Sequence, residues 1–356
     1  MRIDWGGLGF HYTETDYIVR SAYHGEWQKP YATRDKIIPL HVCATCLQYG
    51  QEAFEGLKVF RGVDGKIRVF RWQENAKRMA DSARGLKMEP VPESIFEQAM
   101  CLAIEKNKDF IPPYESGATL YLRPLLIGTT PRLGVGAGSD YEFIIIPSPI
   151  GPYYKDAQCT VHDARLPLHN FLVTRHVDRA APLGTGQFKV GGNYAASFRA
   201  TEAAHAMGLD CLFLDAKTHH YIDECSAANF IGIREVGTKD KGQRMEYLTP
   251  RSTAILPSIT NDSLMTLARE MGLKVTRRKI RLEELSELQE AAACGTACVI
   301  SPIGKVIDPD KGTTYTIQDG AFAPQDSILS QLYHRLQDIQ YGRSEDRYGW
   351  CTMTNL

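Results

Sequence analysis

Short runs of alternating apolar and polar residues dominate the first half of the chain and predict β-strands. Residues 57–71, LKVFRGVDGKIRVFR, place two alternating runs on either side of an Asp-Gly pair. A hairpin is expected here, because a tight turn between two strands needs positive φ and glycine adopts it readily. Residues 16–30 predict an initial strand and hairpin, and the apolar runs at 119–128 and 141–149 predict two further strands.

Helical spacing of apolar residues interrupts these strands. Residues 74–86 place four small or apolar side chains on one face, namely Ala76, Met79, Ala80 and Ala83, which is the pattern of a helix that packs on a core. A second helix is expected from Pro92 to Asn107, with proline in its first turn, where its missing N–H is tolerated.

The second half of the chain predicts short strands and helices in succession. The strands are expected at 211–216, 221–224, 229–233, 274–280 and 296–303. The helices are expected at 195–207, from Thr260 to Gly272, at 282–294 and at 325–342. Gly208 and Gly272 follow two of these helices and are typical helix-terminating residues.

Chain length and one polar interruption predict two domains. A chain of 356 residues exceeds the usual size of one domain. The stretch IGPYYKDAQ, 150–158, places glycine, proline and charges between apolar segments and is interpreted as a linker. We therefore expect a small N-terminal domain over 1–149, a larger C-terminal domain over 159–356, and a mixed α/β (α+β) architecture.

Charge and cysteine content narrow the class of protein. The 41 Lys+Arg and 42 Asp+Glu residues give a net charge of −1, which argues against a nucleic-acid or anionic-membrane partner. No apolar run reaches the roughly 18–20 residues that span a bilayer, and the N-terminal residues lack the pattern of a signal peptide. Nine scattered cysteines indicate reduced, mostly buried thiols. These features predict a cytoplasmic protein that binds small molecules.

Several familiar site patterns are incomplete in this chain. The stretches GTGQFK, 184–189, and GVGAGSD, 134–140, lack the third glycine of a dinucleotide loop, and no Gly-Lys-Ser/Thr or GxSxG sequence occurs. The CxxC of HVCATC, 41–46, has no second Cys/His pair, so buried thiols are favoured over zinc. The THH at 218–220 is interpreted as an exposed turn. No metal site is expected.

Lys189 is the remaining candidate for chemistry, in the stretch FKVGGNYAAS, 188–197. A surface lysine is the simpler interpretation. The small residues beside it nevertheless permit close backbone approach, and the sequence also offers the Tyr194 hydroxyl and the Glu224 carboxylate. A lysine that forms a Schiff base needs surroundings that disfavour its protonated form. A pyridoxal cofactor also needs a carboxylate at its ring nitrogen, as Glu224 would provide.

A phosphate on such a cofactor would need N–H donors. The predicted helix after residue 258 offers backbone N–H groups at its start, with Thr260 as the expected N-cap. Arg78, on the first predicted helix, is a candidate for a bidentate contact.

Several motifs in series resemble the branched-chain amino-acid aminotransferases, which are class IV (fold-type IV) pyridoxal-phosphate enzymes. These motifs are KVGGNY around Lys189, ECSAANF from Glu224, LPSIT at 256–260, GTACV at 295–299, YGQEAFEGLKVFRG at 49–62, LYLRPLLIGTTPRLGV at 120–135, SPIGPYY at 148–154 and DIQYGR at 338–343. The resemblance extends in order from about Phe10 to Arg343. It implies a two-domain fold with the cofactor at the domain interface, and a homodimer.

The resemblance also implies roles for individual residues. Lys189 would form the Schiff base and move a proton, Glu224 would pair with the pyridinium nitrogen, and Tyr194 would bind the phenolic oxygen. The phosphate would be bound by Arg78, Ile259, Thr260 and Thr296. The substrate pocket would be formed by Phe10, Phe54, Tyr121, Arg123, Tyr153 and Ala297, with Tyr49, Leu133 and Val135 reaching in from the partner subunit.

The implied reaction transfers the amino group of L-leucine, L-isoleucine or L-valine to 2-oxoglutarate in two half-reactions. An apolar pocket suits these side chains, and Arg123 with the tyrosines would bind the distal carboxylate of 2-oxoglutarate or glutamate. The chain departs from the family pattern after Glu224, where Cys225, Ser226 and Ala227 replace a Val-Gly-Thr type run. A specialised amino-acid or amine substrate, or a lyase reaction on the same fold, is therefore the alternative.

Overall fold

The computed structural model describes residues 3–151, 165–237 and 244–354. The chain forms two compact units. The N-terminal unit comprises Met1–Tyr153, Phe188–Gly192 and Asp338–Leu356, and the C-terminal unit comprises Tyr154–Gln187 and Asn193–Gln337. Most of the expected linker, 152–158, lies outside the described residues, so the predicted domain boundaries stay a prediction.

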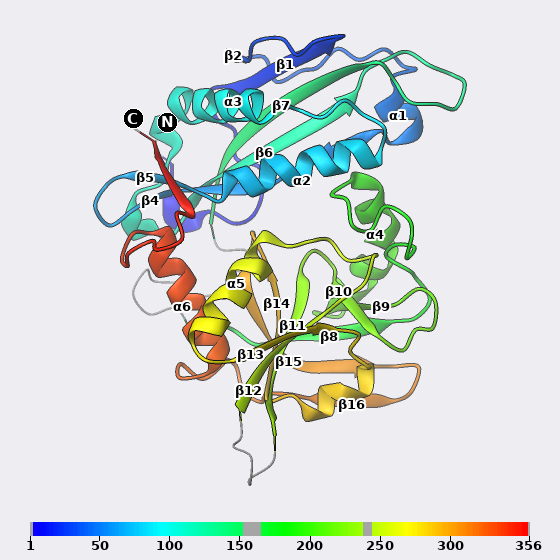
Figure 1. Cartoon of the computed structure of the whole chain (residues 1–356), viewed down its shortest axis with the longest axis vertical. Coiled ribbons are helices and arrows are strands. Elements are labelled where there is room, and N and C mark those ends of the chain that lie inside the picture. Colours follow the sequence, from blue (N-terminus) through cyan, green and yellow to red (C-terminus); the bar gives the residue numbers. More distant parts are fainter. Residues whose placement is uncertain (1–2, 152–164, 238–243, 355–356) are drawn as a thin grey trace. The chain divides into compact units, whose positions relative to one another are not determined.

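The N-terminal unit is built on an antiparallel sheet with the strand order β17-β5-β4-β6-β7-β1-β2, in which β3 also pairs with β6 (Figure 1). The strands are β1 (Ile18–His24), β2 (Tyr31–Thr33), β3 (Glu52–Phe54), β4 (Leu57–Arg61), β5 (Ile67–Phe70), β6 (Thr119–Gly128), β7 (Asp140–Ile150) and β17 (Cys351–Thr354). Its longer helices are α2 (Trp72–Gly85) and α3 (Glu93–Lys106), and its short ones are η1 (Trp5–Gly7), α1 (Thr45–Tyr49), η2 (Lys108–Phe110) and η3 (Tyr114–Ser116).

Both long helices of this unit pack on one face of its sheet. Met79 of α2 and Phe96 of α3 are fully buried in one core with Val59, Leu120 and Phe143 from the strands. The smaller cluster of Ile18, Ile127 and Ile144 lies next in sequence to Val19, Leu126 and Phe143 of that core, because successive side chains of a strand point to opposite faces. The helical and alternating patterns of the first half are thus explained by one shared core.

Most elements expected in the first half are present. The hairpin over 57–71 is formed by β4 and β5, and Gly65 in its turn has φ +77°. The runs at 119–128 and 141–149 are β6 and β7, and the two expected helices are α2 and α3. The short α1 and β3 were not expected, because segments of five and three residues carry too little periodicity to be recognised.

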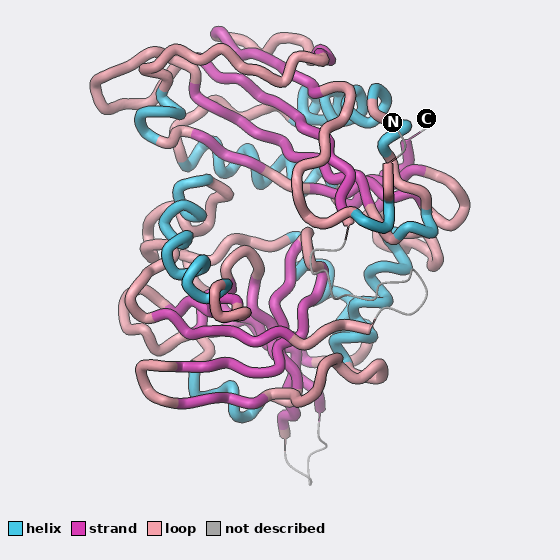
Figure 2. The backbone as a smooth tube through the Cα atoms, turned by 180° about the vertical axis from the view of Figure 1, so that it is seen from behind, coloured by secondary structure: helices cyan, strands magenta, loops and turns pink. Residues whose placement is uncertain are grey.

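The C-terminal unit is built on a closed barrel (Figure 2). Strand β10 pairs with β9 on one side and β11 on the other, which closes the ring β10-β9-β8-β15-β14-β11, and β12, β13 and β16 extend the sheet. Its strands are β8 (His169–Thr174), β9 (Asp210–Leu214), β10 (Ile222–Cys225), β11 (Asn229–Val236), β12 (Arg244–Pro250), β13 (Lys274–Arg278), β14 (Glu290–Gly295), β15 (Val299–Asp308) and β16 (Thr313–Thr316).

The helices of the second half connect or cover these strands. They are α4 (Gly191–His205), α5 (Ile259–Glu270), the 3₁₀ helix η5 (Leu282–Glu287) and α6 (Ile328–Gln340). Helix α4 joins the parallel strands β8 and β9, a connection that needs a crossover. Ala200 and Ala204 of α4 pack on Cys211 and Phe213 of β9.

The helix predicted at 282–294 is wrong over its second half. Residues Glu290–Gly295 form β14, which pairs with β11 and β15. The run EAAAC favours a helix by intrinsic propensity, but pairing on both sides inside the barrel overrides that preference. Its five residues are all buried, and alanine and cysteine are small enough for a strand that is packed on both faces.

Helix α5 also begins differently from the prediction. Its N-cap is Ser258, whose hydroxyl accepts a hydrogen bond from the backbone N–H of Asn261 at 3.1 Å. Thr260, the expected N-cap, lies inside the first turn. Both residues carry a hydroxyl, so the sequence alone could not separate them.

The cysteines are less buried than expected. The eight cysteines among the described residues are free thiols; Cys211, Cys225 and Cys294 are buried and Cys101 is exposed. Cys159 lies outside the described residues. Where the chain is described, none of its helices combines the length and the apolar character needed to cross a bilayer.

Gly186 is required by a close backbone approach in the C-terminal unit. A Cβ at this position would lie 2.3 Å from the carbonyl oxygen of Ala254, whereas a Cβ at Gly192 would meet nothing within 4 Å. We expect Gly186→Ala to lower the free energy of unfolding by about 1–3 kcal/mol, because the backbone must shift. Gly192→Ala is the matched control and should be neutral or stabilising. Urea unfolding of both variants measures the difference, and equal midpoints would contradict the prediction.

Candidate functional site

The main chain of Lys189 is held within the N-terminal unit. Its backbone N–H donates to the Ser82 hydroxyl at 2.9 Å, and its carbonyl accepts from the N–H of Phe54 at 3.0 Å. The next residue, Val190, is buried in the core of this unit. Helix α2 and strand β3 therefore fix the root of the lysine side chain.

The amine of Lys189 lies in a cluster of aromatic and cationic side chains. Its Nζ lies 4.5 Å from the ring centroid of Phe54, and the Arg123 guanidinium lies 4.8 Å from the same centroid. Arg123 donates to the Tyr121 hydroxyl at 3.2 Å. The Tyr121 ring contacts Phe10 edge to face, with centroids 5.4 Å apart. Five predicted site residues are thus neighbours in this unit.

Glu52 adds a half-buried carboxylate close to this cluster. Burial raises its pKa, while a hydrogen bond from the Gly191 N–H and the charge of Arg123 oppose the shift. A Cβ on Gly191 would lie only 1.8 Å from the Glu52 Oε1, so the first glycine of the Gly-Gly pair makes room for this carboxylate. The first glycine after Lys189 is explained by that contact.

Arg78 does not stand alone on helix α2. Its Nε and Nη2 donate to the two carboxylate oxygens of Glu55 at 2.7 and 2.8 Å. Glu55 is fully buried and the Arg78 side chain is largely buried. Arg78 was predicted as a site residue from the sequence, whereas its carboxylate partner Glu55 was not.

Glu224, on β10 of the C-terminal unit, is a buried carboxylate with a cationic partner. The Arg179 Nη2 lies 2.5 Å from its Oε1, and both side chains are almost fully buried. Burial raises the pKa of Glu224 to about 7, although the charge of Arg179 acts to lower it. Arg179 was not among the predicted site residues. It lies far from Glu224 in the sequence, and no local pattern indicates that the two side chains meet.

A buried hydrogen-bond network connects Glu224 with the start of α5. Asn229 Nδ2 donates to Glu224 Oε2 at 3.0 Å, and Asn261 Nδ2 donates to Asn229 Oδ1 at 3.2 Å. The Tyr247 hydroxyl donates to Asn261 Oδ1 at 2.7 Å. The amide of Asn261 thus belongs to the buried hydrogen-bond network of this unit.

Thr296 and Ala297 lie in the tight turn between β14 and β15. Gly295 pairs with Val299 across this turn, and Val299 has φ +61°, which is unusual for a β-branched residue. A Cβ on Gly295 would lie 3.6 Å from the Ala227 carbonyl oxygen. The turn is therefore close to the residues that follow Glu224.

The other predicted residues lie in further segments of the chain. The Tyr49 hydroxyl donates to the Leu133 carbonyl, but Leu133 and Val135 are 77% and 89% exposed. Tyr194 lies in the first turn of α4 and is half-buried, and Ile259 begins α5. Tyr153 lies outside the described residues.

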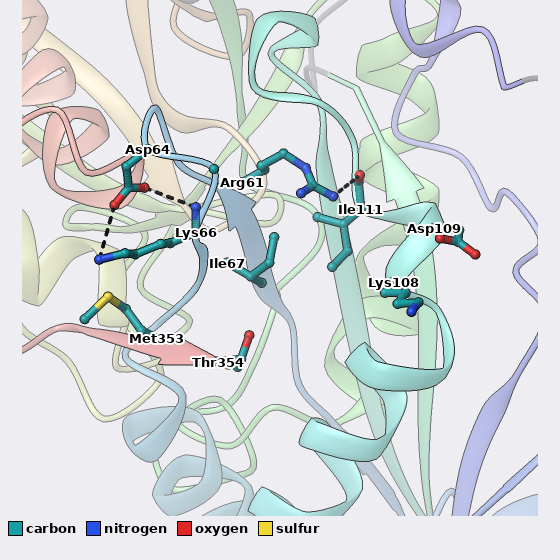
Figure 3. Close-up of a pocket in the computed structure, with 10 residues that line it drawn as sticks. Arg61, Asp64, Lys66, Ile67, Lys108, Asp109, Ile111, Met353 and Thr354 are labelled. Atoms are coloured by element: carbon teal, nitrogen blue, oxygen red, sulfur yellow. Dashed lines mark hydrogen bonds and ion pairs between the residues drawn. The ribbon is translucent and has the colours of Figure 1, made fainter. Parts of the chain in front are cut away.

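A cavity of about 670 Å³ opens elsewhere in the N-terminal unit, beside β5 and β17 (Figure 3). Its lining includes Arg61, Lys66 and Lys108, and Asp64 pairs with Lys66 and with Arg68. None of the predicted site residues lines it. Within the described ranges, no group of three or more His, Cys, Asp or Glu side chains is arranged to hold a metal ion.

The raised pKa of Glu224 predicts a pH-dependent stability of the cofactor-free protein. The Glu224 carboxyl binds its proton more tightly in the folded state, where its pKa is about 7, than in the unfolded state, where its pKa is 4.5. The resulting stabilisation is complete below pH 4.5 and is lost as the pH rises through about 7. Relative to Glu224→Gln, the free energy of unfolding of the wild type should fall by about 3 kcal/mol between about pH 4.5 and about pH 8.

Denaturant unfolding at a series of pH values measures this difference. Glu235→Gln is the matched control, because it removes an exposed carboxylate from the neighbouring strand β11 and should leave the pH dependence unchanged. A wild-type profile parallel to that of Glu224→Gln would show that burial does not perturb the carboxylate.

Known proteins resemble the chain over nearly its whole length. Residues 52–306 match the family model described as amino-transferase class IV. The branched-chain-amino-acid aminotransferase of Haemophilus influenzae is 40% identical over 356 residues, covering 98% of this chain and 98% of that protein. Transaminase htyB of Aspergillus rugulosus is 36% identical over 354 residues, covering 98% of this chain and 92% of that protein.

A solved structure shares the fold. The crystal structure of the branched-chain amino acid aminotransferase from Thermobaculum terrenum, in its PLP-form, matches with a TM-score of 0.74 at 22% identity, covering 95% of this chain and 98% of that chain. This likeness confirms the predicted fold-type IV architecture, and the family match confirms the resemblance inferred from the motifs. The chain belongs to the class IV aminotransferase family.

Proposed function

We propose that this chain is a pyridoxal 5'-phosphate-dependent transaminase that transfers the amino group of L-leucine, L-isoleucine or L-valine to 2-oxoglutarate. The observation that carries the proposal is the position of Lys189: a half-buried amine with an anchored main chain, over the Phe54 ring that Arg123 also contacts. An amine held among apolar and cationic groups has the surroundings that a reactive lysine needs.

The described residues supply the donors and acceptors that such a cofactor requires. Glu224 is a buried carboxylate for the ring nitrogen, and Arg179 supports its ionised form. The first turn of α5 forms the N-terminus of a twelve-residue helix, where the helix dipole favours an anion. The chemical character of these groups fits a phosphate-bearing pyridine ring, so the cofactor implied by the motifs remains part of the proposal.

Each group has a defined task in the proposed reaction. The bound cofactor supplies an electron sink for the bond that breaks at the substrate Cα. Lys189 would hold the cofactor through Nζ, and in its free form the same nitrogen would accept the proton that leaves the substrate Cα and pass it on to the cofactor. Glu224 would hold a proton at the ring nitrogen, and the Tyr194 hydroxyl would donate to the phenolic oxygen.

The phosphate and the substrate carboxylate would bind to two sets of groups that share Thr296. Arg78, Ile259, Thr260 and Thr296 are the proposed phosphate ligands, two of them through backbone N–H groups. Backbone N–H groups at Thr296 and Ala297 would bind the carboxylate of the substrate. The tight turn between β14 and β15 favours this role, because it brings successive N–H groups close together.

The substrate side chain would lie against Phe10, Phe54 and Tyr121. Their rings, in contact with one another or with Arg123, offer an apolar wall that stabilises aliphatic side chains by about 0.8 kcal/mol per buried CH₂. Arg123 and the Tyr121 hydroxyl would bind the distal carboxylate of 2-oxoglutarate or glutamate. One site would thus accept both substrates in turn.

A homodimer and a reducing compartment are part of the proposal. Tyr49, Leu133 and Val135 are exposed apolar residues on neighbouring segments of the N-terminal unit, and such patches favour coverage by a partner. In the dimer, these three residues of each subunit would reach the substrate bound to the other subunit. The free thiols agree with a cytoplasmic location.

A second candidate function is a transaminase for a specialised amino acid. Ala227 follows Glu224 at a position where the motif has a hydroxyl, and it is exposed in the turn between β10 and β11. The similarity to transaminase htyB supports this alternative. It differs from the first candidate in substrate and keeps the same chemistry.

The test is an absorbance titration of the purified protein loaded with pyridoxal 5'-phosphate. L-Leucine should bleach the visible band of the lysine-bound cofactor, and 2-oxoglutarate should restore it. Lys189→Ala should lack the leucine response and lose about 10⁴-fold in kcat/KM, the upper range for a positioned acid–base group. Lys217→Ala, which removes an exposed lysine, is the matched control and should retain both.

The outcomes separate the alternatives. A band that leucine leaves unchanged but another amino acid or amine bleaches would support the specialised transaminase. A band that forms in the wild type and is equally reactive in Lys189→Ala would exclude Lys189 as the reactive amine. Failure of the wild type to bind the cofactor would overturn the proposal as a whole.

A further inference from the structure

Glu55 is a fully buried carboxylate that holds the predicted phosphate-binding arginine. Its side chain is 0% exposed. Its oxygens accept hydrogen bonds from Arg78 Nε at 2.7 Å, Arg78 Nη2 at 2.8 Å and Asn75 Nδ2 at 2.8 Å, and from the Gly56 N–H at 3.1 Å. Four donors at these distances are what an ionised carboxylate needs in an interior.

The paired donors fix the direction of the Arg78 guanidinium. The group is planar, so two parallel hydrogen bonds along one edge define the orientation of the whole plane. Asn75 lies on the same helix, α2, and also donates to the Gly56 carbonyl at 3.2 Å. The carboxylate is therefore itself held by α2 and by the link between β3 and β4.

The same helix holds the reactive lysine. Ser82, one turn after Arg78, accepts the hydrogen bond of the Lys189 N–H, and its own hydroxyl donates to the Arg78 carbonyl at 2.9 Å. Phe54, next to Glu55, binds the Lys189 carbonyl. The arginine and the lysine thus share one support made of β3 and α2.

We propose that Glu55 is a positioning residue that pre-orients Arg78 for an anionic group, the phosphate of the proposed cofactor. This inference rests on the proposed function. Glu55 contributes by removing the freedom of a long side chain before the phosphate arrives, so that less order is lost on binding. Its negative charge has the opposite effect, since it weakens the attraction of Arg78 for an anion. The orienting effect therefore predicts that loss of Glu55 weakens phosphate binding, whereas the charge effect predicts that its loss strengthens phosphate binding.

Comparison of two ligands that differ only in the phosphate separates these effects. The apparent Kd of the cofactor-free protein is measured for pyridoxal 5'-phosphate and for pyridoxal by absorbance titration. Glu55→Gln should raise the Kd of pyridoxal 5'-phosphate by at least about tenfold, which is the effect of losing a hydrogen bond to a charged group. The Kd of pyridoxal should change by less than about twofold. The ratio of the two Kd values is the readout, because a general loss of stability affects both ligands alike.

Four further variants sharpen the test. Glu142→Gln is the matched control, since Glu142 is another buried carboxylate of this unit that pairs with an arginine, Arg20; its ratio should equal that of the wild type. Asn75→Ala leaves Arg78 and Glu55 in place and should shift the ratio in the same direction by a smaller factor. Glu55→Gln combined with Arg78→Lys should be no weaker than Arg78→Lys alone, because both changes disrupt one interaction.

Each remaining outcome contradicts the inference. Tighter or unchanged binding of pyridoxal 5'-phosphate to Glu55→Gln would mean that charge outweighs orientation. An equal rise in the Kd of both ligands would assign Glu55 a structural role only. If the wild type bound both ligands equally, Arg78 would have no phosphate to hold, and the phosphate site of the proposed function would fail with it. If Glu55→Gln did not fold, an unchanged ratio in Asn75→Ala would overturn the inference by itself.

Discussion

Two main-chain hydrogen bonds hold Lys189 to the N-terminal unit, although the residue follows strand β8 of the C-terminal unit in the sequence. A lysine amine sits at the end of a long, flexible side chain, so its reach is defined only if the backbone at its root is fixed. Ser82 and Phe54 provide that fixation, and the buried Val190 strengthens it. The short segment that carries the lysine is thereby part of the core of this unit.

In each unit a buried arginine pairs with a buried carboxylate at the candidate site. Glu55 binds Arg78 in the N-terminal unit, and Glu224 binds Arg179 in the C-terminal unit. A buried ion pair is a weak source of stability, because desolvation offsets most of the attraction. Its value lies in the fixed direction of the groups, which a ligand with a charged end and a protonated ring nitrogen would exploit.

Barrel closure explains why the C-terminal groups are neighbours. Strand β10 pairs with β11, which sets Glu224 opposite Asn229, and β11 pairs with β14, which sets Asn229 opposite Cys294. The amide of Asn229 then connects Glu224 with Asn261 in α5. Residues far apart in the chain therefore meet through strand pairing and one row of side-chain hydrogen bonds.

The sequence by itself determined the mixed α/β architecture, the hairpin over 57–71, helices α2 and α3 and the candidate lysine, because periodicity and turn residues act over a few neighbours. It also carried the family motifs, which named Glu224 and Arg78 as candidates. Only the tertiary structure decided that 290–295 is a strand, that Ser258 caps α5, and that Glu55 and Arg179 are the partners of the buried charges. These features depend on pairing between distant segments, and local propensity holds no information about which segments will pair.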